Sequence, residues 1–333
     1  MKKTFLYFCL LFIVQTAFAA DSLYVREQQI PILIDRIDNV LYEMRIPAQK
    51  GDVLNEITIQ IGDNVDLSDI QAIRLFYSGV EAPSRKGEHF SPVTYISSHI
   101  PGNTRKALES YSVRQDEVTA PLSRTVKLTS KQPMLKGINY FWVSIQMKPE
   151  TSLLAKVATT MPNAQINNKP INITWKGKVD ERHVGIGVRQ AGDDGSAAFR
   201  IPGLVTTNNG TLLGVYDIRY NSSVDLQEKI DIGVSRSTDK GQTWEPMRVA
   251  MTFKQTDGLP HGQNGVGDPS ILVDEKTNTI WVVAAWTHGM GNERAWWNSM
   301  PGMTPDETAQ LMLVKSEDDG KTWSEPVSYT HLT

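Results

Sequence analysis

The chain has 333 residues, of which 40% are hydrophobic and 21% are charged, and its formal net charge is -3. This length is enough for two domains with cores of their own, and the balance of apolar and charged residues is not that of a disordered chain. A near-neutral charge without a basic stripe gives no footprint for nucleic acid or an anionic membrane, so neither is expected as a partner.

The N-terminus has the pattern of a secretory signal peptide over residues 1–19. Two lysines precede an apolar run from Phe5 to Val14, and Ala17 and Ala19 supply the two small residues of a small-x-small cleavage site. The run is too short to span a membrane. The one cysteine, Cys9, lies inside this segment, so cleavage would leave a mature chain without thiols. We therefore expect an exported protein, periplasmic or secreted, that contains no disulfides.

Residues 21–180 show the period-two hydrophobic pattern of half-buried β-strands. Residues 57–61 and 171–175 place an apolar side chain at every second position, and residues 73–77 do so less cleanly because Phe76 interrupts them. The run from Tyr140 to Val143 is apolar on both faces, as in the middle of a central strand. These patterns predict a β-sandwich, which could bind carbohydrate or serve only as a packing or spacer domain.

The region from residue 185 to residue 333 is expected to be a second domain, and it begins with four strand-like runs, at 199–205, 212–218, 230–234 and 245–251. Asn208-Asn209-Gly210 lies between the first two runs, and a glycine after asparagine is a common hairpin signal. The polar loop from Tyr220 to Lys229 separates the second run from the third. Four consecutive antiparallel strands make one blade of a β-propeller.

A second copy of this pattern follows, with runs at Asp268–Val273, Ile280–Trp286 and Leu311–Val314. The turns Ser237–Trp244 and Ser316–Trp323 match at Ser, Asp, Gly, Thr and Trp, each at the same offset. Repeated units of this kind need neighbours to bury their faces, so they occur in arrays. Two blades cannot close a ring. We therefore expect the chain to be truncated, so that its propeller is incomplete and contains only the first blades.

The two Ser-x-Asp-x-Gly-x-Thr-Trp turns are expected to be structural. Serine and aspartate side chains bond to the backbone of a tight turn, glycine supplies a positive φ, and tryptophan fills the space between strands. A calcium loop is the alternative, but only one or two carboxylates per turn would face a common point. We expect no bound metal and no cofactor.

Alternate connections of an up-and-down sheet lie at opposite ends, which places five residues together at the end away from these turns: Arg200, Arg219, Asp225, Asp268 and Trp286. Two arginines suit a small anionic ligand, because a guanidinium binds a carboxylate through two parallel hydrogen bonds. Asp225 is a candidate acid/base, or alternatively a carboxylate that caps the loop. Trp286 and the pair Trp296-Trp297 offer flat surface for a sugar ring. Arg200 could instead brace its strand in an ion pair, and the tryptophan pair could pack between blades.

At these residues the sequence resembles the bacterial exo-sialidases, or neuraminidases, of the retaining glycoside hydrolase type. The resemblance covers Phe199 to about Val327. It rests on Phe199-Arg-Ile-Pro202, on Arg219 with Asp225 six residues later, on Asp268-Pro269, and on the two turns, which are Asp boxes. It implies a six-bladed β-propeller that removes terminal α-linked sialic acid from glycoproteins, glycolipids or oligosaccharides.

The resemblance also implies a role for each residue. Arg200 would be the first arginine of the triad that binds the sialic acid carboxylate, and Arg219 would contact the substrate beside it. Asp225 would be the general acid/base, Asp268 would face the O4 region of the sugar, and Trp286 would line the N-acetyl pocket. The family uses a tyrosine nucleophile with a glutamate as its base, because a carboxylate nucleophile would be repelled by the substrate's own carboxylate.

The tyrosine, its glutamate and the other two triad arginines should lie beyond residue 333, so this chain alone is expected to be inactive. Two other functions stay open. One is a lectin, a propeller that binds sialic acid without cleaving it, although a lectin has no need of an acid at Asp225. The other is an Asp-box propeller that binds proteins or cleaves neutral polysaccharides, which has no need of Arg200.

Overall fold

The structure is a computed structural model that describes residues 22–27, 29–80, 112–176, 180–289 and 295–329. The predicted signal peptide lies outside these residues. The described residues form five β-sheets, together with the helix α3 (Ala295–Asn298) and three 3-10 turns, at Leu67–Asp69, Asp193–Gly195 and His261–Gln263. In the described part of the chain, no helix is long and apolar enough to cross a membrane.

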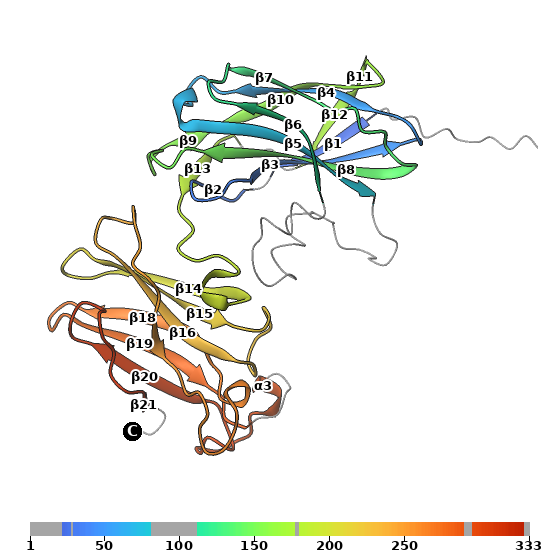
Figure 1. Ribbon diagram of the computed structural model, residues 1–333. Coiled ribbons are helices and arrows are strands. Elements are labelled where there is room, and N and C mark those ends of the chain that lie inside the picture. The colour runs from blue at the N-terminus through green and yellow to red at the C-terminus, as the bar shows by residue number, and fades with distance from the viewer. Residues whose placement is uncertain (1–21, 28, 81–111, 177–179, 290–294, 330–333) are drawn as a thin grey trace, which may run out of the picture.

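The N-terminal part is the β-sandwich that the sequence predicts (Figure 1). Its larger sheet contains, in spatial order, β12 (Asn172–Lys176), β1 (Ser22–Glu27), β3 (Asn39–Ala48), β8 (Gly137–Met147), β5 (Ile70–Val80) and β6 (Val113–Thr119). The facing sheet contains β11 (Lys169–Pro170), β10 (Thr159–Ile166), β4 (Leu54–Ile61) and β7 (Thr125–Thr129). A small third sheet contains β2 (Ile32–Leu33), β13 (Arg182–Gly185) and β9 (Lys156–Val157).

The hydrophobic periods of the sequence correspond to the core of this sandwich. Residues 57, 59 and 61 of β4 are fully buried against side chains of the larger sheet. Residues 140–143 lie in β8, between β3 and β5, and are buried on both faces as predicted. Phe76 interrupts the period of β5 because its ring stacks on Trp142, with 4.0 Å between the ring centroids, outside the core cluster.

The sandwich extends beyond the predicted boundary at residue 180, because β13 pairs with β2 and with β9. Arg182 of this strand is only 4% exposed. Its guanidinium donates to the carbonyl oxygens of Ile30 at 2.8 Å and Val40 at 2.7 Å. The segment that follows the predicted boundary thus includes a buried arginine that holds the last strand to the sandwich.

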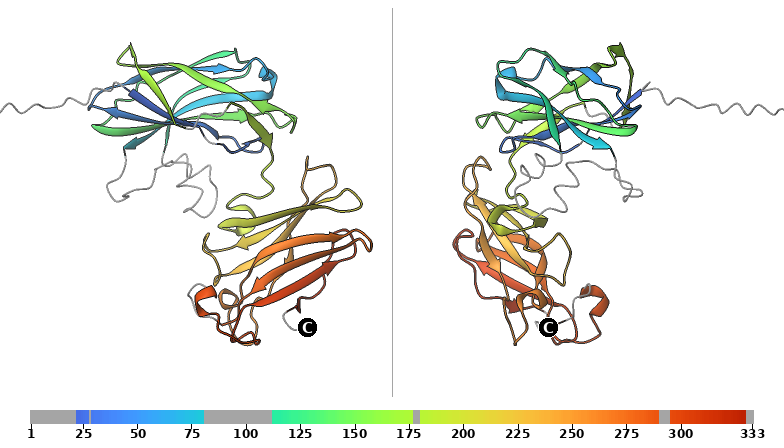
Figure 2. Two further views of the ribbon diagram at one scale, coloured as in Figure 1. Left: turned by 180° about the vertical axis from the view of Figure 1, so that it is seen from behind. Right: turned by 45° about the vertical axis from the view of Figure 1, so that its right-hand side comes forward.

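The C-terminal part contains two four-stranded antiparallel sheets that lie side by side (Figures 1 and 2). Sheet I consists of β14 (Ala198–Thr206), β15 (Leu212–Arg219), β16 (Ile230–Ser237) and β17 (Arg248–Met251). Sheet II consists of β18 (Val266–Asp274), β19 (Thr279–Trp286), β20 (Gln310–Ser316) and β21 (Val327–Ser328). The strands of each sheet pair in chain order, which confirms the two predicted repeats, and both sheets contribute to one apolar cluster.

The two Asp boxes are hydrogen-bonded turns, as predicted. In the first, Ser237 Oγ donates to Asp239 Oδ1 at 2.8 Å and accepts from the Gly241 backbone N–H at 2.8 Å. Thr243 donates to the Asp239 carboxylate from its N–H at 2.9 Å and from its hydroxyl at 2.5 Å, and these bonds lower the pKa of Asp239 to about 2. The turn at Ser316–Trp323 repeats this geometry.

A cluster around Asp319 joins the two sheets at the Asp-box end. Asp319 belongs to the turn of sheet II, and its carboxylate accepts from the β14–β15 connection and from β16 of sheet I. Thr207 Oγ1 and Thr211 Oγ1 each donate at 2.6 Å, and Arg236 Nη2 donates at 3.0 Å. Lys240 occupies the same position in the first Asp box, and both residues have positive φ values, of 62° and 66°. The Asp319 cluster fixes the two sheets to each other at this end.

Candidate functional site

The opposite end of the two sheets carries the predicted site residues. Arg200 lies in β14 directly across from Asp217 of β15, and β15 ends at Arg219. The polar loop that contains Asp225 begins at the next residue and returns to β16. The strand order therefore brings both arginines and Asp225 to the same end of sheet I, as the sequence predicts.

Arg200, Arg219 and Asp225 form an ion cluster. Asp225 Oδ1 accepts from Arg200 Nη1 at 2.9 Å and from Arg219 Nη1 at 2.6 Å. The backbone carbonyl of Ser223 accepts from the same two atoms, at 3.2 Å and 2.8 Å. The side chains of Arg200 and Asp225 are 44% and 41% exposed, whereas that of Arg219 is 1% exposed. One arginine of the cluster is thus part of the interior, and the other can meet a ligand from solvent.

Asp217 connects this cluster to sheet II. Its carboxylate is 1% exposed and accepts from Arg219 Nε at 3.0 Å and Nη2 at 2.7 Å. Its other oxygen accepts from the backbone N–H of Asp268 at 2.9 Å. Burial raises the pKa of Asp217 to about 6, against the opposing effect of the bonds from Arg219 and Asp268. Asp268 is therefore placed beside the cluster through its backbone.

Asp217 is not among the predicted site residues, although the sequence contains a signal for it. The residue is a charged side chain within the apolar run of β15, two positions before Arg219, and residues two apart share a face of a strand. A buried carboxylate needs a partner, and the arginine on the same face supplies one.

A second group of side chains fixes the ends of the loop that contains Asp225. Asp231 is 4% exposed and accepts from the Tyr220 hydroxyl at 3.0 Å and from His261 Nε2 at 2.8 Å. Burial, with Asp231 adding to it, raises the pKa of Tyr220. The ammonium of Lys229 lies 4.5 Å from the centre of the Tyr220 ring. Both ends of the loop are therefore anchored, by the interactions of Tyr220 and of Lys229.

Trp286 lies in the apolar cluster between the sheets and is 7% exposed. Its ring stacks on Phe253, with 4.3 Å between centroids, and lies 5.2 Å from the ring of His288. The structure gives it no contact with the ion cluster, so its role in lining a pocket stays a prediction. Trp297 of α3 is 65% exposed, and the side chain of Trp296 lies outside the described residues.

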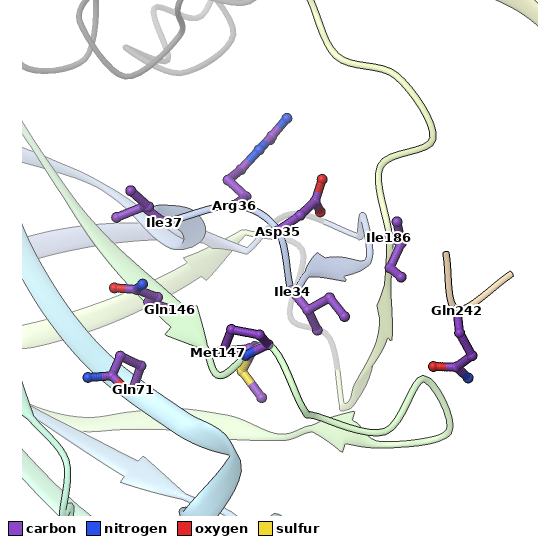
Figure 3. A pocket seen from close by; sticks show the side chains of 10 residues that line it. Ile34, Asp35, Arg36, Ile37, Gln71, Gln146, Met147, Ile186 and Gln242 are labelled. Atoms are coloured by element: carbon purple, nitrogen blue, oxygen red, sulfur yellow. The ribbon is translucent and has the colours of Figure 1, made fainter. Parts of the chain in front are cut away.

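A separate pocket of about 600 Å³ lies beside the small third sheet of the sandwich (Figure 3). Ile34 and Met147 line it from the sandwich, and Gln242 approaches from the first Asp box. None of the predicted site residues lines this pocket, so it is distinct from the ion cluster. Within the described ranges, no group of three or more His, Cys, Asp or Glu side chains could hold a metal ion.

Comparison with known proteins gives matches over most of the chain. Residues 20–170 match the family described as the N-terminal domain of BNR-repeat neuraminidase, and residues 201–333 match the BNR repeat-like domain. A sialidase of Bacteroides fragilis (strain YCH46) is 56% identical over 336 residues, which cover 99% of this chain and 61% of that protein. A sialidase of Paraclostridium sordellii is 36% identical over 132 residues, covering 40% of this chain and 30% of that protein.

Among solved structures, the Hadza microbial sialidase Hz136 is similar to this chain, with 60% sequence identity and a TM-score of 0.79. The match covers 92% of this chain and 59% of that one. The chain thus spans about three fifths of the length of these two relatives. The two domain matches and the near-complete alignment agree with one another. The chain belongs to the sialidase family.

Proposed function

We propose that the protein is an exo-α-sialidase that hydrolyses terminal sialic acid from glycoproteins, glycolipids or oligosaccharides. The observation that carries this proposal is the ion cluster, in which Asp225 accepts from two guanidinium groups at one end of the sheets. Sialic acid has a carboxylate on its anomeric carbon, and an arginine at the mouth of a site is suited to bind it.

Arg200 is the arginine that exchanges partners in this proposal. Its side chain is 44% exposed, and its Nη1 is bonded to Asp225 at 2.9 Å. The incoming substrate carboxylate takes the place of Asp225 as the partner of Arg200. Asp225 then protonates the leaving glycosidic oxygen and afterwards activates the water that releases the sugar. Arg219 holds the loop, Asp268 faces the O4 region of the sugar, and Trp286 borders the N-acetyl pocket.

The remaining chemistry is assigned to residues that follow this chain. A tyrosine nucleophile with a glutamate base gives a covalent intermediate and retention of configuration. Two further arginines complete the carboxylate site, and four further blades close a six-bladed propeller around it. The relatives' greater length supports this division, since the chain covers about three fifths of them. We also propose that residues 1–19 are a signal peptide and that the protein acts outside the cytoplasm.

The test is sialic acid release by the full-length protein, with the chain continued to the length of its relatives. Asp225→Ala should strongly lower turnover of natural sialosides, by about 100-fold or more for the loss of a general acid, and should leave binding of a sialic acid analogue largely intact. Glu228→Gln is the matched control, because Glu228 lies in the same loop and accepts from Asn221 instead of the arginines. An unchanged rate in Asp225→Ala removes Asp225 from the acid role.

The same experiment separates hydrolysis from binding alone. A lectin on this fold would bind the sialic acid analogue but would release no sialic acid from any natural sialoside. The 333-residue chain is expected to release no dye from a fluorogenic sialoside, and detectable release contradicts the assignment of the nucleophile to residues beyond it.

A further inference from the structure

The buried carboxylate of Asp217 has no role among the residues assigned so far. It lies on β15, 1% exposed, and every contact described for it leads to a residue of the proposed site. Burying a charged carboxylate is costly unless it is paired and hydrogen-bonded, and here three donors satisfy it.

Asp217 fixes the orientation of Arg219. One oxygen of the carboxylate accepts from both Nε and Nη2, so the guanidinium plane cannot rotate without breaking two bonds. The remaining terminal nitrogen, Nη1, is thereby directed at Asp225 and at the carbonyl of Ser223. The position of Asp225 thus depends on Asp217, which acts on it through Arg219.

Asp217 also fixes Asp268 on the neighbouring sheet. Its Oδ1 accepts from the Asp268 backbone N–H at 2.9 Å, and Asp268 has a left-handed φ of 57°, which is uncommon for a residue other than glycine. Gly267 comes just before it, and a Cβ atom there would lie 3.5 Å from both Asp217 oxygens. The carboxylate is therefore packed closely against the backbone that carries Asp268.

The charge of Asp217 bears on the proton that Asp225 must carry. Arg219 is buried and bonded to Asp225 at 2.6 Å, and an unbalanced guanidinium at that distance favours the ionised form of Asp225. A general acid must instead hold a proton when the substrate binds. The paired charge of Asp217, 2.7 Å from the same guanidinium, offsets this effect.

We propose that Asp217 is a positioning residue for the reaction, which orients Arg219, holds the Asp268 backbone, and balances the charge of Arg219 so that Asp225 can act as an acid. This inference rests on the proposed sialidase activity and assigns a role to one further residue of that site. The charged groups beside Asp217 are Arg219 on its own strand, Arg200 across from it on β14, and Asp268 on β18.

The test compares two substrates of the full-length protein. Sialyllactose has a poor leaving group that needs a proton from the acid, whereas a methylumbelliferyl sialoside has a good one that needs it far less. Asp217→Asn keeps the size of the side chain but removes its charge. We expect kcat/KM to fall on the order of tenfold more for sialyllactose than for the aryl sialoside. The basic limb of the sialyllactose pH profile should also move to lower pH.

Asp319→Asn is the matched structural control, because it removes a bonded carboxylate at the other end of the same two sheets. It should lower the melting temperature without changing the ratio of the two substrates. Asp217→Glu retains the charge and should keep the substrate ratio near that of the unmodified protein, even if it lowers stability. This second variant gives an answer if Asp217→Asn does not fold.

Equal losses on both substrates in a folded Asp217→Asn variant would overturn the proposal and leave the sialidase activity intact. A shift of the ratio by about tenfold in Asp217→Glu would also overturn it, because this variant keeps the charge and the charge could then not be the cause. If the unmodified full-length protein cleaves neither substrate, the proposed function itself fails, and the role of Asp217 fails with it.

Discussion

Replacing Asp319 by asparagine should destabilise the C-terminal sheets, because it removes the charge at the centre of the Asp319 cluster. The side chain of Asp319 is 14% exposed and bonded to Thr207, Thr211 and Arg236. Asparagine keeps the size of the side chain and tolerates the left-handed φ of 66°. The substitution therefore changes the hydrogen bonding and the charge while leaving the backbone unstrained.

The magnitude follows from the bonds that are lost. A hydrogen bond to a charged group contributes about 1.5–3 kcal/mol, and the asparagine carbonyl can retain one of the threonine bonds. Its amide would meet the donors of Arg236, which is 4% exposed but keeps its bonds to Glu245 and to the Asp319 carbonyl. We expect a loss of about 2 kcal/mol, or roughly 4–8 °C in melting temperature for a unit of about 150 residues.

Thermal unfolding followed by tryptophan fluorescence measures this effect, since Trp286 and Trp323 lie in or against the shared apolar cluster. Lys240→Asn is the control, because Lys240 has the same place in the first Asp box, a similar φ of 62° and an exposed side chain. That variant should melt within about 1 °C of the unmodified chain. A melting temperature for Asp319→Asn equal to that of Lys240→Asn would refute the account of the Asp319 cluster.

Three further predictions concern other parts of the two sheets. Gly265→Ala places a Cβ atom 2.2 Å from the carbonyl oxygen of Glu228, so the loop that carries Asp225 must move. This overpacking should lower the free energy of unfolding by about 1–3 kcal/mol, measured by chemical denaturation, and a loss under about 0.5 kcal/mol would show that the loop moves without cost. Arg200→Lys in the full-length protein should raise KM about tenfold, because an ammonium cannot bind a carboxylate bidentately, and an unchanged KM would remove Arg200 from substrate binding. Burial opposes the shift, but bonds from Thr322 and the rest of the turn lower the pKa of Asp318 from 3.8 to about 2, so its stabilising effect is present above pH 3.8 and lost as the pH falls toward 2. Asp318→Asn should therefore flatten the dependence of melting temperature on pH between about 4 and 2, and an unaltered slope would contradict this origin of the shift.

Much of the fold could be predicted because its signals are local. The period of two along β4 and β5, the turn at Asn208–Gly210 and the repeated Asp box each depend on a few adjacent residues. The proximity of Arg200 and Asp225 could also be predicted, because the order of strands in an up-and-down sheet determines which loops lie at the same end.

The parts that could not be predicted depend on contacts between distant segments. Arg182 lies beyond the predicted end of the sandwich, and its role as a buried anchor depends on the distant carbonyl groups of residues 30 and 40. The stacking of the Trp286 ring on Phe253 joins two distant parts of the chain, and no local pattern indicates it; the predicted role of Trp286 in a sugar pocket stays a prediction. The hydrogen bond from Asp268 to Asp217 joins two sheets through a backbone atom, which leaves no trace in side-chain patterning.

The two sheets are linked at both of their ends, by Asp319 at one and by Asp217 at the other. A single link would leave a pivot about which one sheet could swing against its neighbour, whereas two links along the same seam remove that freedom. Residues that different repeats contribute to the site can then keep a constant spacing when a ligand binds and leaves. The precision of the site is thus a property of the seam between repeats, and recombining repeats from different relatives would conserve it only if both links were transferred together.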